Sequence, residues 1–265
     1  MRDAREGARE EEKREAERHD ELYRKQRPAD LRMASEDWEK FDRIGTPLNS
    51  YHASVVRLGP LEGKRVLDAG CGDGWLSVIL ARRGAQVEGF DVSSEAVATA
   101  TARAAANGVS DRTSFKVASF YELPYPDATF DLAIGQAILH HVGDKEKAAA
   151  ELHRVLKPGG RAVFNEPLGT SLMLERLRRL VPVPSEAPDD PEQWSEQFKH
   201  HQAALFEKYF DVRLEEFHLF SRLDRVISSR AARDFLGRTD RALLRIIPPL
   251  RRYARSIVVE LTKRQ

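Results

Sequence analysis

The sequence has little of three features that define large classes of protein. It contains a single cysteine, Cys71, among 265 residues, which excludes a disulfide bond within the chain and a metal cluster held by thiolates. It contains no apolar run near the roughly 18 residues that are needed to cross a bilayer, and its first residues lack the apolar core of a signal peptide. We therefore expect a cytoplasmic protein.

An excess of charge of one sign is also missing. The chain has 43 Lys and Arg against 42 Asp and Glu, which gives a formal net charge of +1. This balance disfavours nucleic acid as a partner, because a polyanion is attracted by a strong positive excess. Apolar side chains make up 41% of the composition, as in a soluble protein with a proper core. The length suits one α/β domain with insertions, or a core with a small cap.

Composition divides the chain into four segments. Residues 1–29 are mostly charged and have no apolar stripe that could dock on a core, so we expect a flexible tail that is dispensable for cofactor binding. Residues 30–58 are amphipathic and predict two short helices of a substrate cap. Residues 59–167 alternate between strand and helix patterns and form the predicted cofactor-binding core. Residues 168–265 predict further cap helices and two strands that complete the sheet.

The alternation of strands and helices predicts the architecture. Strands are expected at 64–68, 86–91, 113–118, 130–135, 161–165, 212–219 and 256–262, with a turn at 157–160. Helices are expected at 75–83, 94–107, 145–156, 172–180 and 194–209. This order predicts a Rossmann-like α/β fold with a seven-stranded, mostly parallel sheet, helices on both of its faces and a helical substrate cap.

The strongest local signal is the segment Val66–Gly74, VLDAGCGDG. A strand delivers Asp68 at its carboxyl end, and the glycines that follow let the backbone approach a ligand closely. The next helix points its N-terminal amides at the same place. The second strand ends in Asp91, where a carboxylate can accept both hydroxyls of a ribose.

Two details separate a nicotinamide site from an S-adenosylmethionine site. The dinucleotide fingerprint has glycine at the sixth position of its motif, where this chain has Trp75. Asp68 lies where a pyrophosphate would meet unfavourable charge, whereas the ammonium of a methionine head group would be attracted. The site therefore favours S-adenosylmethionine.

Over residues 60–167 the chain resembles the class I S-adenosylmethionine-dependent methyltransferases. The resemblance rests on four ordered segments, VLDAGCGDG (66–74), GFDVS (89–93), ELPYPDATFDLAIGQAILHHV (122–142) and ELHRVLKPGGRAVFNEP (151–167). It implies that S-adenosylmethionine is bound and S-adenosylhomocysteine is the product. The residues that it implies for cofactor binding are Asp68, Ala69, Gly70, Cys71 and Gly72 at the methionine moiety, Asp91 at the ribose, Val92, Ser119 and Phe120 at the adenine, and Gln136 near the methionine. Many relatives have Asp where Ser119 stands.

Three residues are candidates for catalysis. Methyl transfer from a sulfonium is an in-line displacement, so the enzyme must align the acceptor and, where needed, remove its proton. His140 and His141 follow the fourth strand and Glu166 closes the fifth, which places all three near the carboxyl ends of the strands. Either histidine could act as a base, and the alternative is a structural role. No Asp, Glu or His cluster has metal-ligand spacing, so we expect no metal site.

The segments outside the core predict the substrate class. They carry many large apolar side chains, which suit a small-molecule or lipid acceptor better than a charged polymer. The basic segment 222–264 could rest on an anionic membrane or could be a cap helix with a solvated face. Two alternatives stay open, a protein or RNA methyltransferase and a nucleotide-binding protein without methyl transfer. The acceptor atom is left open between O, N and C, and so is the oligomeric state.

Overall fold

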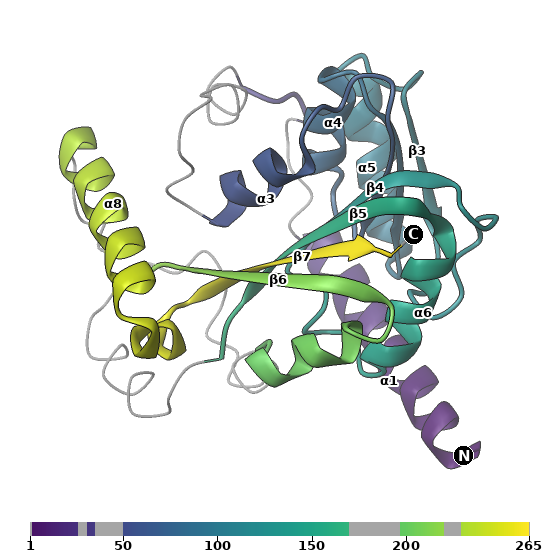
Figure 1. Ribbon diagram of the computed structural model, residues 1–265. Coiled ribbons are helices and arrows are strands. Elements are labelled where there is room, and N and C mark those ends of the chain that lie inside the picture. The colour runs from purple at the N-terminus through teal and green to yellow at the C-terminus, as the bar shows by residue number, and fades with distance from the viewer. Residues whose placement is uncertain (1, 26–30, 35–49, 170–196, 220–228, 265) are drawn as a thin grey trace.

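A seven-stranded sheet is the centre of the computed structural model, which describes residues 2–25, 31–34, 50–169, 197–219 and 229–264 (Figure 1). The strands are β1 (Arg65–Ala69), β2 (Gln86–Asp91), β3 (Thr113–Val117), β4 (Phe130–Gln136), β5 (Leu156–Pro167), β6 (Phe210–Phe217) and β7 (Ser256–Lys263). Their order across the sheet is β3-β2-β1-β4-β5-β7-β6. β7 runs antiparallel to β5 and β6, and the other pairs are parallel. The predicted fold class is confirmed.

The core lies in two layers because successive side chains of a buried strand point to opposite faces. In β5, Val163 belongs to the apolar cluster on one face, whereas Ala162 and Phe164 belong to the cluster on the other. The helices α3 (Ser50–Leu58), α4 (Trp75–Arg82) and α5 (Ser94–Ala106) cover the first face. The second face is covered by α6 (Lys145–Val155) and the 3₁₀ helix η1 (His200–Phe206).

The predicted turn at 157–160 is part of β5 instead. Phe130 pairs with Leu156, and the next pair joins Leu132 to Arg161, so the residues between them form a bulge. Gly159 supplies the positive φ of 70° at this bulge. The segment 157–160, expected as a turn before the strand, therefore lies within β5, and the pairing of β4 with β5 continues beyond it to Phe130 and Leu156.

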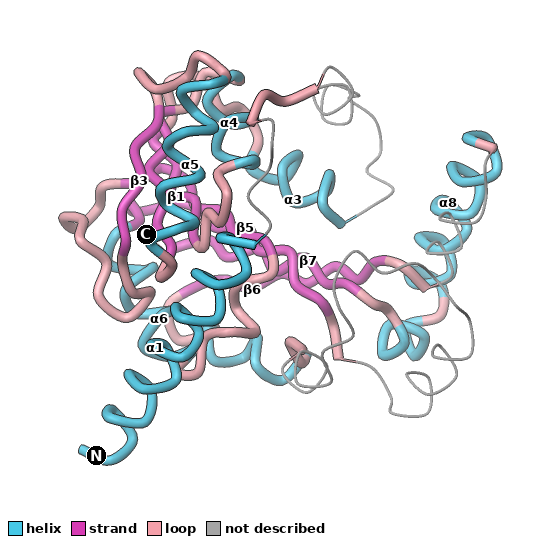
Figure 2. Tube along the Cα trace, turned by 180° about the vertical axis from the view of Figure 1, so that it is seen from behind, coloured by secondary structure: helices cyan, strands magenta, loops and turns pink. Residues whose placement is uncertain are grey.

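The segment 1–29, expected as a tail without a docking surface, contains the long helix α1 (Arg2–Lys25). Figure 2 shows α1 in front of the strands, with its N-terminal end projecting away from the rest of the protein. The contacts that hold it against α5 are polar. Asp20 accepts hydrogen bonds from the Ser93 hydroxyl (2.6 Å) and from the Glu95 amide (3.1 Å) at the N-terminus of α5. A carboxylate is stabilised there by the unpaired amides and the helix dipole, so α1 docks without an apolar stripe.

The C-terminal part differs from the prediction at one helix. The expected helix 194–209 is reduced to η1 within the described residues, because Phe198 runs extended beside the end of β5. Its amide donates to Pro167 and its carbonyl accepts from Gly169. Beyond β6 lie α8 (Arg230–Ile246) and the 3₁₀ helix η3 (Pro248–Tyr253), at the far end of the β6–β7 pair in Figure 1.

Several expectations fall on residues that are not described. The first of the two helices expected in 30–58 and the helix at 172–180 lie outside the described residues. The second helix expected in 30–58 is α3, which packs on the sheet. Among the helices that the structure describes, none has the length and apolar character to cross a membrane.

Candidate functional site

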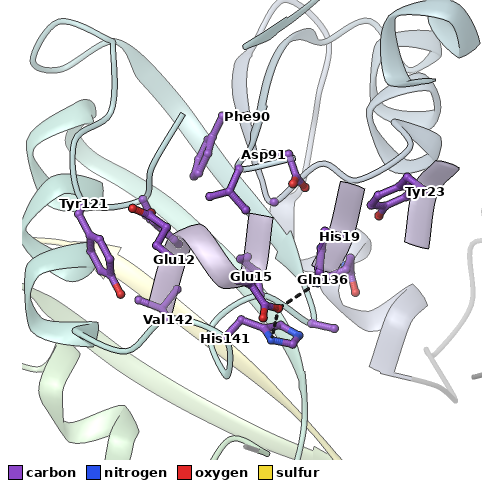
Figure 3. Close-up of a pocket in the computed structure, with 15 residues that line it drawn as sticks. Glu12, Glu15, His19, Tyr23, Phe90, Asp91, Tyr121, Gln136, His141 and Val142 are labelled. Atoms are coloured by element: carbon purple, nitrogen blue, oxygen red, sulfur yellow. Dashed lines mark ion pairs between the residues drawn. The ribbon is translucent and has the colours of Figure 1, made fainter. Parts of the chain in front are cut away.

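A cavity of about 260 Å³ lies at the carboxyl ends of β1, β2 and β4, where ligands of open α/β sheets bind (Figure 3). Helix α1 lies over it and supplies part of its wall. The lining residues are Glu12, Glu15, His19, Tyr23, Gly70, Phe90, Asp91, Val92, Phe120, Tyr121, Gln136, Ala137, Ile138, His141 and Val142.

The loop after β1 forms one wall and has no room for side chains at two glycines. A Cβ atom at Gly70, whose φ is 66°, would lie 2.7 Å from the side chain of Ile138. A Cβ atom at Gly72, whose φ is 51°, would lie 2.5 Å from the hydroxyl oxygen of Tyr23. The positive φ angles favour glycine at both positions, and a side chain at Gly70 would also have to displace Ile138.

Asp68, in β1 just before this loop, is buried and is not among the residues that line the cavity. Its Oδ2 atom accepts a hydrogen bond of 2.5 Å from the Ser77 hydroxyl. Burial raises the pKa of Asp68 to about 7; the Ser77 hydrogen bond opposes this shift, and the charges of Asp91 and Asp73 add to it. A nearby cation would favour the charged carboxylate, so Asp68 is suited to an ammonium group.

Asp91 ends β2 and faces the cavity. Its Oδ2 atom accepts from the Gly72 amide at 3.0 Å and its Oδ1 atom accepts from the Ser93 amide at 2.9 Å. Burial raises the pKa of Asp91, and these two amides oppose the shift. Each carboxylate oxygen keeps a lone pair beyond its amide, so the group is oriented to accept from hydroxyls in the cavity.

Aromatic and apolar side chains form the wall beside Asp91. The rings of Phe90 and Phe120 meet edge to face with centroids 5.3 Å apart, and Val92 and Phe120 line the cavity. Ser119 does not line it. Its hydroxyl accepts from the Tyr121 amide at 3.0 Å, in a local turn. This wall offers an apolar slot for a flat ring.

The structure brings the three predicted catalytic residues together, since His140 contacts both Glu166 and the ring of His141, but it gives them different surroundings. Glu166 is fully buried, and its carboxylate accepts from the amides of Ile138 (3.0 Å), Leu139 (2.9 Å) and His140 (3.3 Å). It also lies 2.7 Å from Nδ1 of His140, so this pair holds the loop after β4. His141 faces the cavity, and neither His140 nor Glu166 lines it. Of the three, His141 alone is placed to meet a ligand there.

Two residues of α1 reach the same part of the cavity. Oε1 of Glu15 lies 2.9 Å from Nδ1 of His141, 2.9 Å from Nε2 of His19 and 2.7 Å from Nη2 of Arg18. Figure 3 shows the two histidines on either side of this carboxylate. Burial raises the pKa of Glu15, but its partners outweigh burial and hold the pKa well below its usual range. Burial lowers the pKa of His141 despite the Glu15 contact.

Tyr23, also on α1, lies over the glycine loop. Burial raises the pKa of its phenol, and the charges of Asp91 and Asp73 add to the shift, so the hydroxyl stays protonated. The sequence prediction missed Glu15, His19 and Tyr23, because α1 has no apolar face. The one signal was the spacing of Glu15 and His19, which places both on one side of a helix.

Comparison with known proteins identifies the central segment. Residues 67–164 match the family model described as a methyltransferase domain. Over 125 residues the chain is 37% identical to the 27-O-demethylrifamycin SV methyltransferase of Amycolatopsis mediterranei (strain S699), with 44% of this chain and 46% of that protein covered. Over 146 residues it is 40% identical to a ubiquinone biosynthesis O-methyltransferase of Rhizobium etli, with 48% and 57% covered. The chain thus spans about half the length of these curated relatives.

Solved structures share the fold. A SAM dependent methyltransferase from Aquifex aeolicus superposes with a TM-score of 0.55 at 18% identity, over 89% of this chain and 100% of the other. The similarity extends beyond the matched segment into the N-terminal and C-terminal parts of the chain. The fold is therefore shared with a protein of low sequence identity.

Proposed function

The chain contains a class I S-adenosylmethionine-dependent methyltransferase domain, and we propose that the protein transfers the methyl group to an oxygen atom of a small-molecule or lipid acceptor. The observation that carries the proposal is the cavity that joins Gly70 and Asp91 to His141. Two relatives act, by their names, on the 27-O position of a rifamycin and in ubiquinone biosynthesis as an O-methyltransferase. These names favour oxygen as the acceptor atom.

The residues present fit S-adenosylmethionine. Asp68 would hold the ammonium, the backbone of Ala69, Gly70, Cys71 and Gly72 would follow the methionine moiety, and Asp91 would accept from the ribose hydroxyls. Val92 and Phe120 would contact the adenine, with Ser119 at its edge, and Gln136 would lie near the methionine. When bound, S-adenosylmethionine supplies an electrophilic methyl group on a sulfonium and leaves as S-adenosylhomocysteine.

We place the acceptor beside His141. Because burial lowers its pKa, the imidazole is neutral near neutral pH and offers a lone pair to the proton of an acceptor hydroxyl. His140 and Glu166 act through it as positioning residues, since their ion pair and the three amides on Glu166 hold the loop that carries His141. The rings of His140 and His141 pack against each other with centroids 3.9 Å apart, so His140 also supports the His141 imidazole directly.

The test is methyl transfer by the full chain to a panel of phenols, quinols and hydroxylated polyketides. The release of S-adenosylhomocysteine measures the rate. We expect His141→Asn to lower kcat by about 100-fold or more, as for loss of a general base, with the affinity for S-adenosylhomocysteine within a few fold. His201→Asn, at an exposed histidine of η1, is the matched control. If a labelled methyl group entered RNA or protein and none of the small molecules, the proposal of a small-molecule acceptor would be wrong and a protein or RNA methyltransferase would take its place.

Peripheral membrane contact is a separate proposal that concerns α8. On this helix Phe235 is 72% exposed and Ile246 is 75% exposed, beside the exposed cations Arg238 and Arg245. Exposed apolar groups with nearby cations suit an anionic bilayer surface. Co-sedimentation with vesicles that contain phosphatidylserine should exceed that with phosphatidylcholine vesicles, and Phe235→Ser should abolish the difference. The cytoplasmic location stays a prediction, to be checked by cell fractionation.

A further inference from the structure

Three side chains with metal-ligating atoms meet in the cavity, from segments more than a hundred residues apart. Glu15 and His19 lie one turn apart on α1, and His141 follows β4. Each offers one ligand atom, and these atoms all lie within 4.8 Å of one another. Figure 3 shows the Glu15 carboxylate between the two imidazoles. The expectation of no metal site rested on spacing along the chain, which cannot reveal a cluster that folding assembles.

Two of the three separations between these atoms are near those of a coordination shell. Two ligands that each lie about 2.1 Å from an ion are about 3.0 Å apart at a right angle and about 3.4 Å apart at a tetrahedral angle. Nε2 of His19 and Nδ1 of His141 each lie 2.9 Å from Oε1 of Glu15. An ion could therefore enter with small side-chain movements.

We propose that Glu15, His19 and His141 bind a divalent first-row transition-metal ion, of the type of Zn²⁺, Co²⁺ or Fe²⁺. Two imidazoles and one carboxylate suit these ions, whereas Mg²⁺ and Ca²⁺ prefer sites made of oxygen atoms alone. Three protein ligands leave further coordination positions open, as in catalytic zinc sites. All three residues line the cavity, so the open positions face the space in which the acceptor is placed.

The site also indicates an acceptor class, and this step rests on the proposed function. An oxygen ligand such as a phenol, an enol or a catechol hydroxyl could fill an open position of the ion. The ion would lower the pKa of that hydroxyl, so that its proton leaves to water before the oxygen attacks the methyl carbon. In the metal-free protein Nδ1 of His141 faces the Glu15 carboxylate and carries the ring proton, which leaves the lone pair on Nε2. When Nδ1 binds the ion, the ring proton lies on Nε2, and the ion takes over the role of His141 toward the acceptor proton.

One positive group competes with the ion. Nη2 of Arg18 lies 2.7 Å from Oε1 of Glu15, the same oxygen that the histidines contact. In the absence of metal the cluster is thus an ion-pair network that fixes α1 over the cavity. The ion must displace this guanidinium from Oε1, so removal of the Arg18 charge should strengthen metal binding. If the cluster were only an ion-pair network, removal of this charge would not strengthen the binding of a metal ion.

The tag-free full chain is first stripped of metal with a chelator and is then titrated with Co²⁺ alone. Calorimetry and the visible absorption of Co²⁺ measure binding. We expect saturable binding of one ion with the spectrum of nitrogen and oxygen ligation. Because loss of outer-shell partners already weakens metal affinity about 10–100-fold, we expect His19→Ala to weaken Co²⁺ binding by about 100-fold. His201→Ala, at an exposed histidine outside the cavity, should bind as the unchanged protein does.

Two results would overturn the site. One is a Co²⁺ affinity of His19→Ala equal to that of His201→Ala, and the other is weaker Co²⁺ binding by Arg18→Gln, which retains S-adenosylhomocysteine affinity as a check of folding. The titration needs neither acceptor nor S-adenosylmethionine. Its failure would leave the methyl-transfer proposal intact, and a failed transfer assay would leave the metal site intact.

Discussion

Asp68 and Asp91 end neighbouring strands and are both buried, yet their carboxylates are held by different donors. Asp68 accepts from the hydroxyl and the backbone amide of Ser77, whereas Asp91 accepts from the backbone amides of Gly72 and Ser93. At Asp68 burial disfavours the charged form more than these hydrogen bonds favour it. Asp68 is therefore the residue at which cofactor binding and the stability of the cofactor-free protein oppose each other.

We predict that Asp68→Asn stabilises the cofactor-free protein at pH 8 and abolishes S-adenosylhomocysteine binding. The pKa of Asp68 is about 7 in the folded protein against 3.8 in the unfolded chain. Between these values the folded state keeps a proton that the unfolded state has released, so its stabilising contribution is lost as the pH rises toward 7. At roughly 1.4 kcal/mol per pKa unit, the gain from the substitution is up to about 4 kcal/mol.

Urea denaturation at pH 5 and pH 8 measures this gain, which should appear at pH 8 and shrink at pH 5. Asp131→Asn is the matched control on β4. Burial there is outweighed by hydrogen bonds from Lys157 and Arg65, which hold the pKa of Asp131 below its usual value. That substitution should destabilise the protein at pH 8. A pH-independent gain for Asp68→Asn would contradict the assigned cause.

Asp91→Ala should weaken S-adenosylhomocysteine binding while the domain stays folded. The loss of two charge-assisted hydrogen bonds to a ribose costs roughly 2–4 kcal/mol, which is about 30–1000-fold in Kd. Calorimetry gives this value directly. Glu88→Ala on the same strand removes an ion pair with Arg65 outside the cavity. The affinity of this variant for S-adenosylhomocysteine should equal that of the unchanged protein. Equal affinities of the two variants would mean that the ribose is held elsewhere.

Helix α1 is the element whose role changes most between sequence and structure. The sequence predicted a dispensable segment because α1 has no apolar face. In the structure Asp20 caps α5, Tyr23 covers Gly72 and Glu15 contacts His141. These are polar contacts between side chains of distant segments, which periodicity along the chain cannot reveal.

Removal of residues 2–25 should therefore raise the Kd for S-adenosylhomocysteine by at least about 10-fold, equal to about 1.4 kcal/mol. The described residues of α1 belong to neither apolar cluster, so the far-ultraviolet circular dichroism of the sheet should persist. The control is Lys13→Ala with Glu17→Ala, an exposed pair on the outer side of α1. Unchanged affinity of the truncated chain would restore the prediction from sequence.

At the scale of the whole molecule, the sequence predicted the sheet well and the site in part. The central strands β1 and β4 are buried on both faces and give nearly continuous apolar runs, which mark them without tertiary information. Asp91 and Gly70 line the cavity, and their positions could be predicted because they follow from strand ends, while their role toward a cofactor stays a prediction. Glu166 was misplaced as a cavity residue, since strand position alone does not tell whether a carboxylate points to a ligand or to the amides of the next loop.

Cofactor selectivity is the prediction that concerns the whole molecule. A ligand that binds the folded state at 100 times its Kd should stabilise it by about 2.7 kcal/mol. S-adenosylhomocysteine should produce this stabilisation in thermal or urea denaturation, and NAD at the same concentration should produce none. Stabilisation by NAD and not by S-adenosylhomocysteine would contradict the assignment as a methyltransferase.

The place of β7 has a consequence for synthesis on the ribosome. β7 follows β6 in the chain but lies between β5 and β6 in the sheet. Until residues 256–263 emerge from the exit tunnel, the outer edge of β5 has no partner strand, and β6 has none to pair with. An unpaired, apolar strand edge invites association with other chains. Nascent protein should therefore recruit chaperones until β7 closes the gap.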